Sequence, residues 1–407
     1  MASRTSPLDW QQRCDWARSM RDPEAFANEQ AALGQTWTLL GLSTDIPNDN
    51  DWIRCSLGGV SVFVQRFGVS IKGFENVCQH RFHPIRTSPR GSGLIRCAFH
   101  HWVYNQKGEA VGIPQCRNLF GVSPKELGAK LRKVEIATCG VLIFGRFPAQ
   151  APAKSAPASA ADRSGPGLNE SLEEFLGEAW PILKAMCRHG IKPTLFTKEV
   201  RANWKLLYEI SLEDYHTFAV HPNSLGKNGY LDLDEVHYTR FGPHSGFFHN
   251  GKPGDLSAIS KSCRSENYHP EGYKVLQIFP NLEIAHHQIT DSIWYVFILH
   301  YIPKAYDCTI LWSCYFQAPL KRVQASRRGL MFRKLTNLFL PFFVGTHLKR
   351  INQEDHVICE AMQTTAGSVT EAPLLGLEEQ RIGWFREAYR DALARSNRPK
   401  NSKDDQG

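Results

Sequence analysis

Two groups of cysteine, histidine and acidic residues have spacings suited to metal binding. The first consists of two short arms, Cys78-Gln79-His80 and Cys97-Ala98-Phe99-His100, with sixteen residues between them. Two thiolates and two imidazoles can hold either a zinc ion or a two-iron cluster with one iron on cysteine and the other on histidine. Zinc ribbons and fingers usually pair Cys with Cys, whereas each arm here is mixed. The order of the residues favours the iron cluster, although ligand type alone leaves zinc open.

The second group begins in a segment that is predicted to be helical. Within residues 203–222, Glu209, Glu213 and His216 are spaced by four and three residues, which indicates one face of a helix. His221 lies five residues further on, directly before a proline that should end the helix. Two histidines placed in this way can bind one metal ion, and a carboxylate from elsewhere would complete the facial triad of non-haem Fe(II) oxygenases.

The candidate for that carboxylate is Asp355. It belongs to the segment Asp355-x4-Glu360, 134 residues after His221. On local sequence alone, Glu354 and Asp355 are better explained as the solvated first turn of a helix, where acidic residues are favoured. The ligand interpretation depends on the two groups upstream.

Together the two groups resemble the terminal oxygenase (alpha) component of Rieske non-haem iron oxygenases, over about residues 30–395. The motifs that carry the resemblance are Cys78-Gln-His-Arg81 with Pro84, Cys97-x2-His100 with Trp102 and Gly108, Asn203-Trp-Lys205, and Glu213-x-Tyr-His216-x4-His221. The resemblance implies a [2Fe-2S] Rieske cluster on Cys78, His80, Cys97 and His100, and a mononuclear Fe(II) on His216, His221 and Asp355.

The resemblance also assigns a role to Glu213. Its position is that of a carboxylate that joins an iron histidine, here His216, to a cluster histidine, here His100, of the next subunit, and so carries electrons. Asp214 is the neighbouring alternative, but we expect it to point off the shared helix face. A Glu at this position also occurs in the branch that resembles carnitine and choline monooxygenases, although Ile210 replaces the usual Asn.

Two residues depart from the family pattern. His101 and Phe82 stand where the two cluster loops usually, or often, have glycine. If that glycine serves a left-handed backbone angle, His101 costs on the order of 1 kcal/mol and remains compatible with the loop.

The resemblance implies an α+β fold, in which an N-terminal antiparallel-β Rieske domain precedes a helix-grip (START-like) catalytic domain. We expect the boundaries to be an N-terminal helical segment at 1–32, the Rieske domain at 33–147, an Ala/Pro/Ser linker at 148–167, the catalytic domain at 168–396 and a disordered tail at 397–407.

Apolar and β-branched runs between turn residues predict strands, and periodic apolar positions predict helices. The predicted strands are 37–41, 61–65, 140–145, 197–200, 275–281, 293–300 and 308–315. The predicted helices are 22–32, 171–188 and 378–395. We expect aromatic residues of the sheet and of 247–249 to line a substrate cavity, and we expect His83, His101, His244, His249, His286 and His287 not to be metal ligands.

Composition excludes several classes of protein. The chain has 407 residues, a net charge of +8 and 11 cysteines, an odd count that argues against a disulfide framework and for a reducing cytoplasm. The first seven residues contain no apolar signal core, so we expect no signal peptide. The apolar stretch 338–345 is too short to span a bilayer, so we expect at most an apolar lid there. No nucleic-acid motif is present. Arg81, Arg86, Arg90 and Arg96 near the cluster loops are either solvated loop residues or a basic rim that docks an acidic electron donor.

The expected function is O2-dependent hydroxylation of an aromatic or other apolar small molecule, as a monooxygenase, dioxygenase or demethylase. Because flavin and nicotinamide fingerprints are absent, electrons should come from NAD(P)H through a separate ferredoxin or flavin reductase. The resemblance implies a homotrimer, in which each cluster faces a neighbour's iron. The alternatives are a carnitine- or choline-like amine monooxygenase and a non-catalytic Rieske electron carrier.

Overall fold

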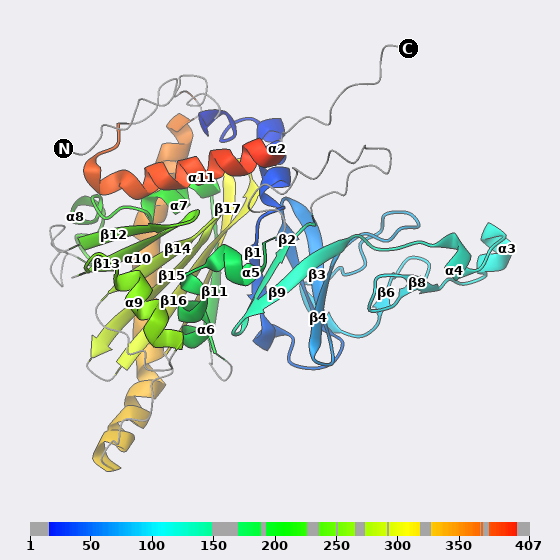
Figure 1. Ribbon diagram of the computed structural model, residues 1–407, viewed down its shortest axis with the longest axis horizontal. Helices are drawn as coiled ribbons and strands as arrows, with labels where there is room; N and C mark the ends of the chain where they lie inside the picture. Colours follow the sequence, from blue (N-terminus) through cyan, green and yellow to red (C-terminus); the bar gives the residue numbers. More distant parts are fainter. Residues whose placement is uncertain are drawn as a thin grey trace. The chain divides into compact units, whose positions relative to one another are not determined.

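The computed structural model describes residues 16–148, 170–188, 193–225, 236–249, 251–264, 273–290, 293–317, 327–366, 368 and 374–396 (Figure 1). The chain divides into two compact units, one formed by residues 30–176 and the other by residues 1–29 together with 177–407. Both units combine helices with antiparallel sheet, which confirms the predicted α+β class.

The unit at 30–176 is built on a seven-stranded antiparallel sheet of order β1-β10-β9-β4-β3-β2-β5. Its strands are β1 (Thr38–Leu42), β2 (Asp51–Leu57), β3 (Val60–Phe67), β4 (Ser70–Glu75), β5 (Arg90–Ser92), β9 (Lys133–Cys139) and β10 (Leu142–Arg146). A second sheet consists of β6 (Ile95–Arg96), β7 (Val103–Tyr104) and β8 (Ala110–Gly112), and the helices are α3 (Cys116–Phe120), α4 (Pro124–Leu127) and α5 (Leu172–Leu176). The three strands predicted in this region are confirmed as β1, β3 and β10.

Alternation along β3 separates two apolar cores in this unit. Val62 and Val64 belong to one core with Ile143, whereas Phe63, between them, belongs to the other. Successive side chains of a strand point to opposite faces, so the two cores lie on the two faces of the sheet. The Phe63 core also contains Cys78 and Cys97, together with Ile85, Ile95, Trp102 and Tyr104. Packing of this core therefore positions the two cysteine loops.

The other unit contains a seven-stranded antiparallel sheet of order β11-β17-β16-β15-β14-β13-β12. Its strands are β11 (Thr194–Val200), β12 (Val236–Phe241), β13 (His244–His249), β14 (Lys274–Ile278), β15 (Leu282–Thr290), β16 (Ile293–Ala305) and β17 (Cys308–Gln317). Its helices are α6 (Ala179–Met186), α7 (Trp204–Ile210), α8 (Thr217–Val220), α9 (Asp255–Arg264), α10 (Arg327–Ala366) and α11 (Gln380–Ser396). The helix α2 (Pro23–Leu33) contains the boundary between the units.

Helices accompany this sheet on the side that carries the candidate iron ligands. The long helix α10 packs against α7, α8 and β11, and α11 packs against β13 (Figure 1). The four strands predicted in this region are confirmed as β11, β14, β16 and β17, and the C-terminal helix as α11. In the part of the chain that the structure describes, no helix is both long and apolar enough to cross a membrane.

Three helix predictions need correction. The helix expected at 171–188 is two helices, because Gly177 between α5 and α6 adopts a left-handed φ of 51°. The helix expected through 203–221 ends at Ile210 and resumes only at Thr217. The alternative of a helix start at Glu354 and Asp355 is wrong, since both residues lie far inside α10.

Other predictions lie largely outside the described residues. All of the expected linker except Pro148 falls there, as does the tail at 397–407. The domain boundaries therefore stay predictions. Within the apolar stretch at 338–345, Phe342 and Phe343 are exposed and Val344 is buried, all of them in α10.

The Asn203-Trp204-Lys205 motif anchors the start of α7. The Asn203 side chain accepts a hydrogen bond from the Lys205 backbone N–H at 3.0 Å and so caps the helix. The fully buried Lys205 ammonium pairs with Glu29 at 2.5 Å and donates to the Ser19 hydroxyl at 2.7 Å. The Trp204 indole N–H donates to the other Glu29 oxygen at 2.7 Å. This motif is therefore structural, and it ties α7 to α2.

We predict that Lys205→Met lowers the free energy of unfolding of this unit by about 3–5 kcal/mol, because it removes the cation that neutralises the buried Glu29 carboxylate. The double variant Lys205→Met, Glu29→Gln should lose less, since neither buried charge remains. Urea unfolding followed by circular dichroism tests both. A double variant less stable than Lys205→Met would contradict the prediction.

Candidate metal centres and substrate cavity

The two cysteine loops are closed by matching hydrogen bonds. In the first, the Cys78 N–H donates to the His83 carbonyl and the Phe82 N–H donates to the Cys78 carbonyl. In the second, the Cys97 N–H donates to the Trp102 carbonyl and the His101 N–H donates to the Cys97 carbonyl. Each loop therefore turns back tightly and holds its cysteine in the buried core.

The side chains of these loops form two pairs. The thiols of Cys78 and Cys97 lie within hydrogen-bonding reach of each other, and the Tyr104 hydroxyl lies 3.2 Å from Cys78 Sγ. His80 Nδ1 and His100 Nδ1 are 3.1 Å apart. The His80 ring stacks on Trp102, with centroids 5.0 Å apart and planes at 2°. A pair of thiols beside a pair of imidazole nitrogens fits the donor set of a two-iron cluster with cysteine on one iron and histidine on the other.

Burial raises the pKa of the Cys78 thiol, and the neighbouring Cys97 raises it further, whereas the Tyr104 hydroxyl lowers it. The Cys78 thiol would therefore stay protonated at neutral pH without a metal. Coordination to iron deprotonates a thiol outright. The pair thus suits a metal better than it suits a thiolate nucleophile.

Phe82 and His101 both adopt a left-handed φ of 57°. A left-handed angle of this kind would explain a preference for glycine at these two positions. In this chain both loops adopt the angle with residues other than glycine. Phe82 is 76% exposed, so its ring gains little packing energy in return. Each non-glycine residue at such an angle costs about 1–2 kcal/mol.

The prediction of four exposed arginines near the cluster loops is wrong for Arg86. Arg86 is buried, donates to Gln65 Oε1 at 2.6 Å and to the Gly93 carbonyl at 3.0 Å, and covers the Trp52 ring at 4.6 Å. It therefore stabilises the core of its unit. Arg81, Arg90 and Arg96 are exposed, and Arg90 pairs with Asp45 at 4.0 Å.

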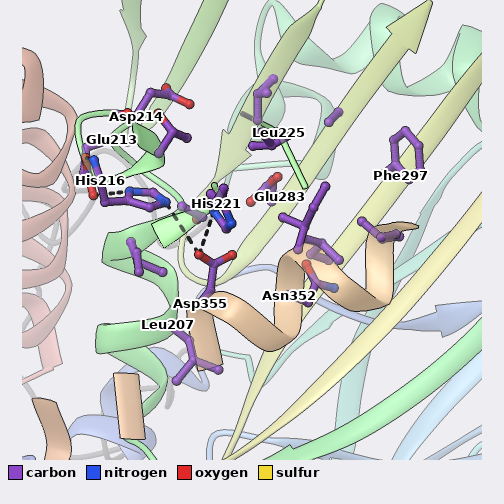
Figure 2. Close-up of a pocket in the computed structure, with 18 of the residues that line it drawn as sticks. Leu207, Glu213, Asp214, His216, His221, Leu225, Glu283, Phe297, Asn352 and Asp355 are labelled. Atoms are coloured by element: carbon purple, nitrogen blue, oxygen red, sulfur yellow. Dashed lines mark hydrogen bonds and ion pairs between the residues drawn. The ribbon is translucent and has the colours of Figure 1, made fainter. Parts of the chain in front are cut away.

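The second group converges at one point in the other unit. One ligand atom from each of His216, His221 and Asp355 lies within 4.8 Å of the others. Asp355 Oδ1 is 3.5 Å from His216 Nε2 and 3.0 Å from His221 Nε2. Figure 2 shows the three side chains pointing toward one another.

The opposite ring nitrogens of both histidines are held by carboxylates. His216 Nδ1 lies 2.5 Å from Glu213 Oε1, and His221 Nδ1 lies 2.8 Å from Glu354 Oε2. A carboxylate on Nδ1 places the proton there and leaves the Nε2 lone pair free, which is the arrangement typical of metal-bound histidine. Both Nε2 atoms then face Asp355 Oδ1, a buried oxygen.

This arrangement fits a cation. Burial lowers the pKa of His216, but hydrogen bonds to Asp355 and Glu213 and the charges of these carboxylates outweigh it and raise the pKa to about 10. A positive charge is therefore favoured between the three residues. A metal ion supplies it, because two imidazole nitrogens and one carboxylate are the ligand set of non-haem ferrous iron.

Three separate segments bring these ligands together. α7 ends at Ile210, and the next turn is closed by Glu213, whose Oε2 accepts the His216 backbone N–H at 3.0 Å. His216 and His221 then flank the short helix α8. Asp355 comes from α10. Glu209, expected on the same face as Glu213, instead forms a bidentate pair with Arg386 at 2.6 and 2.9 Å.

Glu354 is a site residue that sequence reasoning missed. It accepts from the Ser224 hydroxyl at 2.5 Å in addition to its contact with His221. The available signal was an acidic residue directly beside Asp355. A helix places adjacent residues about 100° apart, so the two carboxylates can reach the same histidine from different sides.

A cavity of about 590 Å³ opens beside the candidate iron ligands. Its wall is largely apolar and includes Phe247, Tyr273, Phe297 and Tyr301 from the sheet, and Leu348, Ile351 and Asn352 from α10. Aromatic residues of the sheet and Phe247 line this cavity, as expected, and its role as a substrate site stays a prediction. His244 lies outside it, buried, and its Nδ1 accepts the Phe279 backbone N–H at 3.0 Å, as expected for a structural histidine.

Comparison with known families assigns both units. Residues 186–395 match the family described as ring hydroxylating alpha subunit (catalytic domain), and residues 36–131 match the Rieske [2Fe-2S] domain.

Individual relatives are distant. The terephthalate 1,2-dioxygenase terminal oxygenase component subunit alpha 2 of Comamonas sp is 27% identical over 218 residues, 50% of this chain and 48% of that protein. The carnitine monooxygenase oxygenase subunit of Escherichia coli (strain K12) is 25% identical over 245 residues, 59% of this chain and 60% of that protein. The matching part thus spans roughly half the length of these relatives. The solved naphthalene 1,2-dioxygenase from Rhodococcus sp., bound to indole, has the same fold, with a TM-score of 0.70 and 19% identity over 96% of this chain and 98% of that one.

We predict that Glu354→Gln weakens iron binding at His216, His221 and Asp355 by about 10–100-fold, because it removes the negative charge that orients His221. Equilibrium dialysis against ferrous iron measures the change. Ser224→Ala, which removes the other partner of Glu354, is the matched control and should have a smaller effect. Unchanged iron affinity in Glu354→Gln would contradict the prediction.

We also predict that Phe82→Gly stabilises its unit relative to Phe82→Ala by up to about 1 kcal/mol, since glycine relieves the left-handed backbone angle. Both variants remove the exposed ring, so the difference isolates the backbone. The same order should hold for His101→Gly and His101→Ala. Thermal unfolding measures the order, and a less stable glycine variant at both positions would refute it.

Proposed function

This chain belongs to the ring-hydroxylating alpha subunits with a Rieske [2Fe-2S] domain ahead of the catalytic domain, and we propose that it is the terminal oxygenase of a multicomponent Rieske system. Its reaction is O2-dependent hydroxylation, by mono- or dioxygenation or oxidative demethylation, of an aromatic or otherwise apolar small molecule. The observation that carries the proposal is the convergence of His216, His221 and Asp355 on the wall of an apolar cavity.

We assign the cofactors to the two donor sets. Cys78, His80, Cys97 and His100 would hold the [2Fe-2S] cluster, and His216, His221 and Asp355 would hold Fe(II). When bound, the iron and the reduced cluster together supply the electrons for reductive activation of dioxygen. Glu213 and Glu354 hold the protons on Nδ1 of the two histidines. The apolar wall keeps water from the reacting carbon.

Glu213 is proposed as the bridge for electrons between subunits. Both of its oxygens contact His216, one at the ring and one at the backbone N–H. A carboxylate offers about four acceptor positions, so capacity remains for a histidine donor such as His100 of a neighbouring subunit. Such a bridge requires an assembly in which clusters and irons of different subunits meet, for which a homotrimer is our proposal. Asp214 is a weaker candidate because it pairs with Arg381 at 3.6 Å.

The electrons would come from NAD(P)H through a ferredoxin, a flavin reductase or both. The exposed Arg81, Arg90 and Arg96 near the cluster loops support docking of an acidic donor. Charge complementarity of this kind raises the rate of encounter more than the affinity.

A second candidate function is oxidation of a quaternary amine, and two features support it. A relative is named as a carnitine monooxygenase oxygenase subunit, and Glu213 takes the place of the commoner aspartate. The cavity wall also carries aromatic rings, which attract cations through their faces. A non-catalytic electron carrier would need no mononuclear iron site, and the preserved triad of His216, His221 and Asp355 opposes that alternative.

Iron content discriminates an oxygenase from a carrier. We predict about three irons and two acid-labile sulfides per chain in anaerobically purified protein, from one two-iron cluster and one ferrous ion. Asp355→Ala should fall to about two irons and lose oxygenation, while the low-temperature EPR signal of the dithionite-reduced cluster is unchanged. Zinc in place of iron, or no iron beyond the cluster in the wild type, would sink the oxygenase proposal.

A further inference from the structure

One carboxylate in the cavity has no role in the candidate iron site. Glu283 lies on β15 and faces the cavity together with Ala285. Its cross-strand partners are Gln277 on β14 and Leu299 on β16, and Ala285 is paired with Val275 and Phe297. Glu283 thus interrupts a largely apolar wall (Figure 2). A charge at such a position is costly unless something pairs with it.

The protein itself provides little compensation for this charge. The Tyr301 hydroxyl donates to Glu283 at 3.2 Å, and the Ser211 hydroxyl also lies within reach, although it donates to the Tyr208 carbonyl at 2.7 Å. Over the ranges that the structure describes, no lysine, arginine or histidine forms an ion pair with Glu283. Two neutral hydroxyls leave much of the capacity of a carboxylate unused.

Arg381, the cation whose charge acts on Glu283, is bound to other groups. Its guanidinium pairs with Asp214 at 3.6 Å and donates to Gln277 Oε1 at 2.8 Å. It also lies over the Tyr238 and Phe247 rings, at 5.1 and 5.3 Å from their centroids. Arg381 acts on Glu283 through space, but the charge of Asp214 opposes that effect. The single positive charge of Arg381 therefore acts on two carboxylates, those of Asp214 and Glu283. When both are ionised, their combined negative charge exceeds the positive charge of Arg381 by one.

The electrostatics of Glu283 agree with this balance. Burial raises its pKa to about 7, against the smaller lowering effects of Tyr301, Ser211 and Arg381. A carboxyl group in this condition ionises when a cation is placed beside it, because the cation replaces the missing hydration.

We propose that Glu283 binds a positively charged nitrogen of the substrate, so that the substrate is a small molecule with an apolar body and an ammonium group. The inference rests on the proposed function, since it takes this cavity as the substrate site. Phe297, Phe247 and Tyr273 line the same wall and can contact the apolar body or the cation. An anionic group placed beside Glu283 would be repelled by its carboxylate, since Arg381, which also lines the cavity, is paired with Asp214.

Binding of three probes of similar size tests the inference without turnover. The probes are benzyltrimethylammonium, its neutral isostere neopentylbenzene and the anion 3-phenylpropanoate, titrated calorimetrically into the full-length, iron-loaded protein. We expect the wild type to bind the cation at least about tenfold more tightly than the neutral isostere. Glu283→Gln, which keeps the shape, should bring the ratio close to one.

Tyr301→Phe is the matched control. It removes the hydroxyl that contacts Glu283 but keeps the carboxylate, so the preference for the cation should persist or increase. Equal binding of cation and neutral isostere by the wild type, tightest binding of the anion, or an undiminished preference in Glu283→Gln overturns the inference. If Glu283→Gln fails to fold, equal binding of the cation and the neutral isostere by the wild type still overturns the inference.

The two proposals fail separately. Iron-loaded protein that takes up oxygen but does not prefer the cation overturns only the assignment of Glu283. Protein without a mononuclear iron that still prefers the cation, with the preference lost in Glu283→Gln, overturns only the oxygenase function.

Discussion

The catalytic unit depends on one geometric constraint: Asp355 Oδ1 must meet the Nε2 atoms of His216 and His221 at a single point. α7 must stop early enough for the chain to turn, and α10 must run long enough to carry Asp355 past that turn. Glu213 and Glu354 then lock the rings so that both lone pairs face inward. Two nitrogen lone pairs and a carboxylate oxygen that face one another without a cation are unfavourable. The surrounding packing therefore holds these three atoms together, and a bound cation would remove their repulsion.

The local chemistry of both centres could be predicted from the sequence, but much of their support could not. Short arms such as Cys78-Gln-His80 have few ways to present their ligands, and the structure brings those side chains together. The spacing of polar residues did not predict where a helix ends when a side chain competed with the backbone for a hydrogen bond. Glu213 accepts the His216 backbone N–H, and the expected helix is interrupted there. The sequence around Arg86 predicts a surface residue, because its buried partners come from other strands.

Glu283 shows a further limit of sequence reasoning. In the run Leu282-Glu283-Ile284-Ala285, a charged residue between apolar ones normally indicates the solvent face of a strand. Here both faces are covered, since Leu282 and Ile284 are buried and Glu283 faces a cavity partly lined by α10. Only the position of α10, which follows in the chain more than forty residues later, distinguishes a solvated carboxylate from an enclosed one.

The division of the chain also bears on the order in which it folds during synthesis. Residues 30–176 form a unit of continuous sequence, whereas the catalytic unit combines residues before 30 with residues after 176. Glu29 contacts Lys205 of α7, near the middle of the chain, and the Tyr389 hydroxyl of α11, which is among the last parts to leave the ribosome. The iron–sulfur unit can therefore fold while translation continues, whereas the catalytic unit closes only when translation is nearly complete. Until then, α2 cannot form its contact with α11, because Glu29 and Tyr389 are 360 residues apart in the sequence.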